Sequence, residues 1–249
     1  MTGPRVIVLG SLALLLAALT FEPAAAQMLQ FDLGEEGDGS TASRLIQLVA
    51  LVTILSLAPS ILVMFTSFTR IVVVLSFLRS ALGIQQTPPN SVLISLALFL
   101  TAFVMMPTLQ TVYDEAIQPM VAEEIDEMEA LEKATGPVRM FMLEHVRAQD
   151  LKLFLDMAKT GPIATPEETP MRSLIPAFMI SELRRAFEIG FLLFLPFIII
   201  DMVVASVLMS MGMLMLPPIM ISLPFKLIFF VLVDGWYLVA GSLVQSYST

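Results

Sequence analysis

A few charged side chains set inside long apolar blocks are the residues of this chain most able to do chemistry. Asp201, Lys226 and Asp234 each interrupt a stretch that is otherwise uncharged. Charges in such stretches are costly in lipid and usually face one another, water or a partner. Pairing of Lys226 with Glu182 or Asp201 would fix helix packing, whereas a proton relay through Asp201 lacks a matching second carboxylate. Three more charges, Arg184, Arg185 and Glu188, stand just before the same block.

Methionine is concentrated in one short segment. Of 18 methionines, six fall within 19 residues: Met202, Met209, Met211, Met213, Met215 and Met220. Four of them alternate at every second position, which does not suit one face of an α-helix. Gly212 and the pair Pro217, Pro218 predict a break in the helix. Methionine commonly fills irregular apolar space, but such a turn could also form a deformable gasket that closes a pore by dewetting and yields to a passing chain.

A third segment combines helix-breaking and cationic residues. Gly83 and the pair Pro88, Pro89 predict a rigid turn between two apolar blocks. Arg70 and Arg79 precede this turn and can act as interface anchors or as partners for acidic groups.

The composition indicates a membrane protein and excludes most enzyme classes. The 249 residues are 57% hydrophobic and only 14% charged, against about 25% charged in soluble domains. A net charge of −9 argues against a nucleic-acid partner, which would require clustered cations. With no Cys and one His, a disulfide framework and a Cys or multi-His metal site are excluded, and we expect neither metal nor cofactor. Since there is no Gly-rich phosphate loop either, we expect no enzymatic activity.

The order of apolar and polar segments predicts an all-α membrane protein. Arg5, an apolar run and three alanines predict a signal peptide over residues 1–26, cleaved after Ala26. A flexible acidic tail is expected to follow. Two hydrophobic hairpins, which together contain about four hydrophobic helices, flank an acidic helical insert. The first helix of this insert should end at Gly136. The expected boundaries are 27–43 for the tail, 44–113 for the first hairpin, 114–173 for the insert and 174–249 for the second hairpin. Charge bias places the turn after Arg70 on the cytoplasmic side and the insert in the periplasm.

Most of the chain after the tail resembles the FliP family of flagellar export-gate proteins. The resemblance covers about residues 45–113 and 172–245. It rests on three long runs in order: FTSFTRIVVVLSFLRSALGIQQTPPN, PAFMISELRRAFEIGFLLFLPFIIIDMVVASVLMSMGMLMLPP and LPFKLIFFVLVDGW. Related SctR-type proteins serve virulence secretion, but the signal peptide and the long insert look more like the flagellar branch.

The resemblance implies a helical subunit that assembles as five copies with FliQ and FliR, and with FlhB and FlhA nearby, into a gate for unfolded flagellar proteins. It implies a place in the bacterial inner membrane, in contact with lipid, at the flagellar basal body. The gasket would be Met213, Leu214 and Met215, with Met209 and Met211 close by. Glu182 and Lys226 fall in the matching motifs, and we favour them as an ion pair within or between subunits. A proton-coupled solute transporter and a purely structural scaffold are the other hypotheses.

Overall fold

The computed structural model describes residues 38–248, except for 85, 162, 164 and 214. The described part is entirely helical, without a strand, which confirms the predicted all-α class. The predicted signal peptide and most of the predicted acidic tail, up to residue 37, lie outside it. The chain divides into two compact units, Met1–Leu55 and Ser56–Thr249, and the arrangement described below concerns the second unit.

The first apolar block forms a long helix followed by a shorter one. Helix α2 (Asp38–Phe65) begins before the expected end of the tail at residue 43 and passes through Pro59. A two-residue break then separates it from α3 (Phe68–Ala81). Half of α3 is buried, whereas the apolar side chains of α2 are mostly exposed. The two helices of this block therefore differ in burial, although the sequence of both is similarly apolar.

The second apolar block continues into the acidic insert without a loop. Helix α4 (Asn90–Val112) runs through a π-helical turn (Tyr113–Ile117) into α5 (Gln118–Val121). The expected boundary after residue 113 therefore falls inside a continuous helical stretch, because Asp114 and Glu115 face outward and do not interrupt the backbone hydrogen bonds.

The rest of the insert consists of two helices and a short 3₁₀ turn. Helix α6 (Glu127–His145) starts where the carboxylate of Asp126 accepts a 2.7 Å hydrogen bond from the backbone N–H of Glu129. The expected closure at Gly136 is wrong, because the helix continues and buries Phe141 and Met142. Helix α7 (Ala148–Met157) and the turn Pro166–Glu168 complete the insert.

The C-terminal part is a hairpin with one unusually long arm. Helix α8 (Met171–Ser210) has 40 residues, which corresponds to about 60 Å, twice the thickness of a bilayer's hydrocarbon core. It returns through α9 (Pro218–Leu232) and α10 (Gly235–Gln245). The last two helices meet at a bend of 63°, where Asp234 has a left-handed backbone with φ 51°.

Two to four segments of the described chain are long and apolar enough to cross a membrane. Residues 90–121 and Met171–Ser210 meet this criterion as single helices, and two bent pairs, one within α2 and one formed by α9 and α10, would each add a span. The expected number of about four hydrophobic helices agrees with the upper limit of this range.

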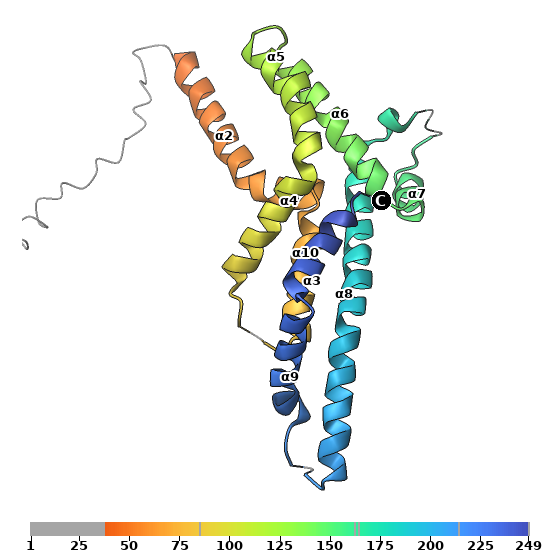
Figure 1. Cartoon of the computed structure of the whole chain (residues 1–249). Helices are drawn as coiled ribbons and strands as arrows, with labels where there is room; N and C mark the ends of the chain where they lie inside the picture. Colours follow the sequence, from red (N-terminus) through yellow and green to blue (C-terminus); the bar gives the residue numbers. More distant parts are fainter. Residues whose placement is uncertain (1–37, 85, 162, 164, 214, 249) are drawn as a thin grey trace, which may run out of the picture. The chain divides into compact units, whose positions relative to one another are not determined.

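The main core lies where α3 packs against α8 (Figure 1). It includes Ile71, Val74, Leu75 and Leu78 of α3, each at most 1% exposed. Side chains of α4, α8, α9 and α10 close around them. A second cluster joins α4, α6 and α8 through Met105, Phe141, Met142, Leu174 and Phe178. The insert and the hairpins thus share the helix α8, which runs through both clusters.

Substituting Gly190 with alanine is expected to lower the melting temperature of the purified protein in detergent. A Cβ at this position of α8 would lie 2.5 Å from the ring of Phe77, which packs edge-on against Phe187 and Phe194. Overpacking of this kind costs about 1–3 kcal/mol. Gly136→Ala is the matched control, because no atom lies within 4 Å of its Cβ position. Equal melting temperatures for the two variants would contradict the close contact between α3 and α8.

Candidate functional site

The methionine segment forms the turn between α8 and α9. Helix α8 ends in a Schellman motif: the N–H of Gly212 donates to the carbonyl of Met209 at 3.1 Å, and that of Met213 donates to Leu208 at 3.0 Å. Gly212 has φ +76°, a conformation that costs glycine little and other residues more. Helix α9 resumes at Pro218. The predicted helix break is therefore confirmed.

The thioethers of this turn point outward. Met209, Met211 and Met213 are about half exposed, and Met215 is 98% exposed. Leu214 lies outside the described residues. The turn stands at the far end of the α8–α9 hairpin from the insert helices α6 and α7 (Figure 1). Within the described chain, these methionines therefore do not pack into a core.

A buried ion pair joins α3 to α8. The Nε–H of Arg70 donates to Oε2 of Glu182 at 2.9 Å, and an Nη2–H of Arg70 donates to Oε1 of the same carboxylate. Arg70 is 2% exposed and Glu182 is fully buried. The two-bond geometry is the one in which guanidinium and carboxylate bind most strongly, and it compensates two charges that are expensive to bury.

The C-terminal residues complete this ion pair. The guanidinium carbon of Arg70 lies 3.8 Å from the ring centroid of Tyr247, a cation–π contact. Arg70 also donates to the carbonyl and the hydroxyl of Ser246, at 3.1 and 3.0 Å. The Tyr247 hydroxyl donates to Glu182. Burial, and next the nearby Glu182 carboxylate, raise the pKa of this hydroxyl well above its ordinary value, so Tyr247 remains a donor.

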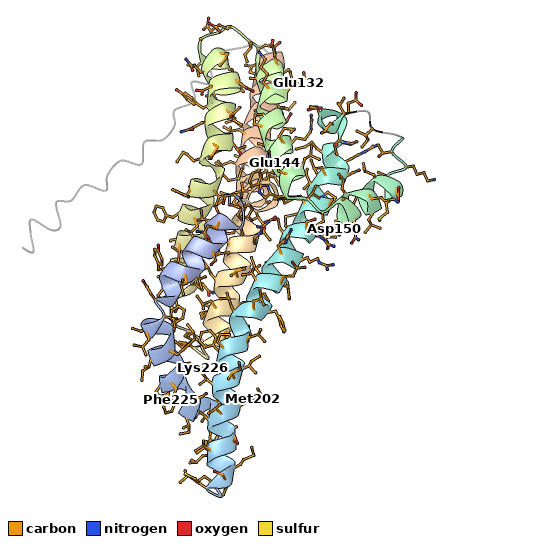
Figure 2. The ribbon with its side chains drawn as sticks, turned by 45° about the vertical axis from the view of Figure 1, so that its right-hand side comes forward. Glu132, Glu144, Asp150, Met202, Phe225 and Lys226 are labelled. Carbon is orange, nitrogen blue, oxygen red and sulfur yellow. The ribbon has the colours of Figure 1, made fainter. Side chains whose placement is uncertain are left out.

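A second ion pair joins α8 to α9. Nζ of Lys226 donates to Oδ2 of Asp201 at 2.7 Å, and the hydroxyl of Ser222 donates to Oδ1 at 2.5 Å. The same ammonium lies 3.3 Å from the carbonyl of Ala81, at the C-terminal end of α3, where a cation is favoured by the helix dipole. Lys226 faces the stretch of α8 that carries Met202 (Figure 2).

These contacts correct the favoured ion pair. Within the chain, Glu182 binds Arg70, and Lys226 binds the alternative partner, Asp201. Within one chain the expected Glu182–Lys226 pair is wrong, because Glu182 of α8 lies beside the start of α3 and Lys226 of α9 lies beside its end. A pair between subunits stays a prediction.

The remaining predicted charges lie on the surface. Arg184 and Arg185 are exposed and contact Glu188 at 2.9 and 4.0 Å. Asp234 is exposed at the bend between α9 and α10 and forms no side-chain ion pair within the described residues. Among the described residues, no three His, Cys, Asp or Glu side chains come together as a metal site.

The predicted turn between α3 and α4 is held by Arg79. Its guanidinium donates to the carbonyl of Pro88 at 3.3 Å and to Oδ1 of Asn90 at 2.5 Å. Gly83 has φ +79°, and Pro89 immediately precedes α4. Sequence reasoning located this turn, but it missed Ser222, Ser246 and Tyr247, since a hydroxyl outside a motif gives no signal of the charge it will contact.

Comparisons with known proteins agree over most of the chain. The model of the FliP family matches residues 51–243. A protein of Caulobacter vibrioides named flagellar biosynthetic protein FliP is 59% identical over 98% of this chain and 91% of its own length. Proteins of the same name from Bacillus subtilis and Aquifex aeolicus are each 54% identical, over 84% and 85% of this chain and 95% and 89% of their own lengths.

Glu182→Gln is expected to destabilise the protein by about 3–5 kcal/mol, because it leaves the charge of Arg70 buried without its counterion. Urea unfolding of the purified protein in detergent measures the loss. Glu188→Gln is the control, since its exposed ion pair is worth about 1 kcal/mol or less. The double substitution Arg70→Met with Glu182→Met should recover part of the loss, because it removes both charges. Equal stability of the two single glutamine variants would contradict the assignment of the pair.

Proposed function

The chain belongs to the FliP family, and on that premise we propose that it is a core subunit of the flagellar type III protein export gate. Its relatives carry the name flagellar biosynthetic protein, and its apolar helices suit a membrane-embedded component. The methionine turn, Met209 to Met215 with Leu214, is the gasket that closes the channel when no protein passes. The protein acts by opening and closing a passage and catalyses no reaction.

The exposure of the methionine side chains is the observation that carries this proposal. Four unbranched thioether side chains project from one turn at the end of a hairpin, with Met215 almost fully exposed. A constriction lined by such side chains excludes water and ions by dewetting, and their three rotatable bonds let them move aside. The Schellman hydrogen bonds end α8 on one side of the turn, and Pro218 begins α9 on the other.

Assembly supplies what one chain lacks. A single turn cannot surround a passage, but symmetry copies would repeat the methionines around an axis. We propose five copies with FliQ and FliR, near FlhB and FlhA, in the inner membrane at the flagellar basal body. The many exposed apolar side chains of α8, α9 and α10 support extensive contacts with such neighbours and with lipid. Since α8 is about twice as long as a membrane span, part of the subunit would project out of the bilayer, into the periplasm with the insert.

Two alternatives fit the structure less well. A proton-coupled transporter would use Asp201, but that carboxylate is already bound by Lys226 and Ser222, which favours a structural role. A virulence secretion gate would share the fold, but the relatives described above are named as flagellar proteins.

Replacing Met213 and Met215 together with alanine is expected to make the assembled complex leak. Shortening both side chains widens the constriction and removes the apolar contacts that keep it dry. Ion flux through the purified complex in liposomes is the measurement, with no exported protein present. Met128→Ala with Met157→Ala is the control, because both methionines are exposed but belong to the insert. An assembled Met213, Met215 variant without increased flux would contradict the gasket and leave a scaffold role for the turn.

Native mass spectrometry of the complex, co-expressed with FliQ and FliR, is expected to show five copies of this chain with the partner subunits. The reason is that one turn closes a passage only when repeated around it. Cleavage after Ala26 would also reduce the 27.3 kDa chain by about 26 residues. A monomer or a plain dimer without partners would contradict the proposed assembly.

A further inference from the structure

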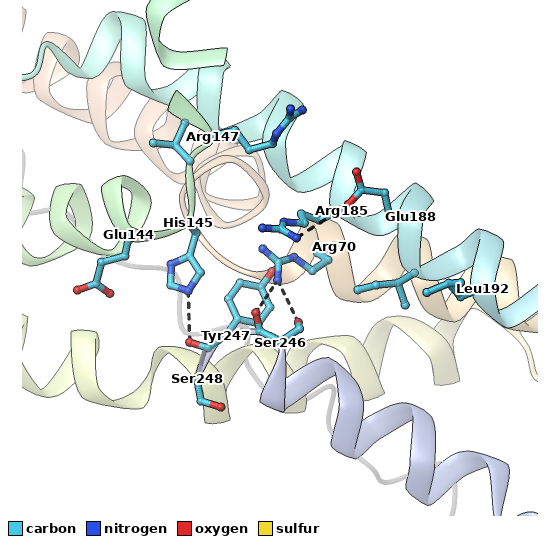
Figure 3. A pocket seen from close by; sticks show the side chains of 12 residues that line it. Arg70, Glu144, His145, Arg147, Arg185, Glu188, Leu192, Ser246, Tyr247 and Ser248 are labelled. Carbon is cyan, nitrogen blue, oxygen red and sulfur yellow. Dashed lines mark hydrogen bonds and ion pairs between the residues drawn. The ribbon is translucent and has the colours of Figure 1, made fainter. Parts of the chain in front are cut away.

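A polar cavity of about 790 Å³ opens beside the C-terminal residues, between the end of α6, the start of α7 and one face of α8. Figure 3 shows guanidinium groups of three arginines around it: Arg70, Arg147 and Arg185. Its apolar lining residues are Val146, Ile189 and Leu192, and two carboxylates, Glu144 and Glu188, also line it. The cavity therefore combines three guanidinium groups and two carboxylates with an apolar wall.

Two of the three guanidinium groups keep most of their hydrogen-bond donors free. Within the described chain, the only ion pair of Arg185 is with Glu188, at 4.0 Å, and that carboxylate already accepts a 2.9 Å hydrogen bond from a neighbouring arginine. Arg147 donates through its side chain to Gln149 at 3.0 Å and lies 3.8 Å from Asp150. Each guanidinium has five N–H donors. Both groups can therefore accommodate another anion.

Helix α8 changes character at this cavity. One helical turn of α8 carries Arg184, Arg185 and Glu188, whereas the following residues, 189–200, contain no charge. Leu192 is 63% exposed, and so is its neighbour Phe191. Cations and the rings of Tyr and Trp beside an apolar helix face are typical of the level at which membrane helices meet lipid head groups. The aromatic ring of Tyr247 lines the same cavity.

We propose that this cavity binds the head group of an anionic phospholipid. Its phosphate lies between the guanidinium groups of Arg147 and Arg185, and its acyl chains follow α8 along Leu192. Guanidinium groups bind phosphate oxygens in pairs, so two of them beside an apolar helix face suit an anionic head group. A lipid is favoured over an acidic peptide because the cationic and apolar parts of the lining meet within one helical turn, as head and tail do in a lipid. The proposal requires only that the helices are embedded in a membrane, and not that the protein is a gate.

Native mass spectrometry of the purified full chain in detergent tests the site. The protein is titrated with phosphatidylglycerol, with phosphatidylcholine of the same acyl chains, and with inorganic phosphate. We expect adducts of phosphatidylglycerol to be retained in preference to the other two. Arg147→Gln with Arg185→Gln should weaken retention by about 30-fold, since each basic residue near a head group contributes about a factor of five.

Lys152→Gln with Arg172→Gln is the matched control. It removes the same charge from α8 and from α7, the helix that Arg147 precedes, at exposed residues that do not line the cavity. This variant should retain phosphatidylglycerol as the unmodified protein does. Arg185→Gln alone changes a side chain that is 57% exposed, so it keeps the test valid if the double variant does not fold.

Three results would overturn the proposal. One is equal retention of phosphatidylglycerol by the arginine variants and the unmodified protein. Another is binding of inorganic phosphate as tight as that of the lipid, which would show an anion site without a place for the acyl chains. The third is loss of self-association in the arginine variants with lipid adducts unchanged, which would assign the cavity to a second copy of the chain. Ion flux through the assembled complex is a separate readout, so a failed lipid site leaves the gate proposal untouched and the reverse also holds.

Discussion

The buried pair of Arg70 and Glu182 is the interaction on which the packing of the described helices depends most. Two charges removed from water cost several kcal/mol each unless they are paired and hydrogen-bonded. Here the carboxylate receives two N–H bonds from Arg70 and one O–H bond from Tyr247. The Nη1 group of Arg70 donates to Ser246. Since these groups come from α3, α8 and the C-terminus, the pair can be satisfied only when all three segments are in place.

Helix α3 is held at both ends by these charges. Arg70 at its start binds Glu182 of α8, and the carbonyl of Ala81 at its end accepts a hydrogen bond from Lys226 of α9. Lys226 in turn binds Asp201 of α8, so α8 and α9 are joined to the same helix. Between the two ends, Ile71, Val74, Leu75 and Leu78 are almost completely buried. One short helix therefore contacts both arms of the hairpin, through its own Arg70 at one end and through Lys226 at the other.

The methionine turn contrasts with this interior. The buried charges have fixed partners, whereas the thioethers of Met211, Met213 and Met215 project from the protein. Backbone hydrogen bonds around Gly212 shape the turn at its α8 end. Exposed, unbranched apolar side chains at the end of a hairpin are the feature on which the proposed seal rests. The same hairpin carries a polar cavity at its other end, where Arg147 and Arg185 keep free donors.

The sequence by itself determined the helical class, the apolar blocks, the turn at Gly83 and the helix break at Gly212, because each follows from local periodicity or from glycine and proline chemistry. It also identified the FliP family. It did not determine which charges pair. Arg70 and Glu182 are 112 positions apart, and only the packing of α3 against α8 brings them together. The passage of α6 beyond Gly136 was likewise decided by tertiary structure, since burial of Phe141 and Met142 outweighs the local helix-breaking signal. The partners of a buried charge and the end of a buried helix depend on which surfaces meet, and that information is not local in the chain.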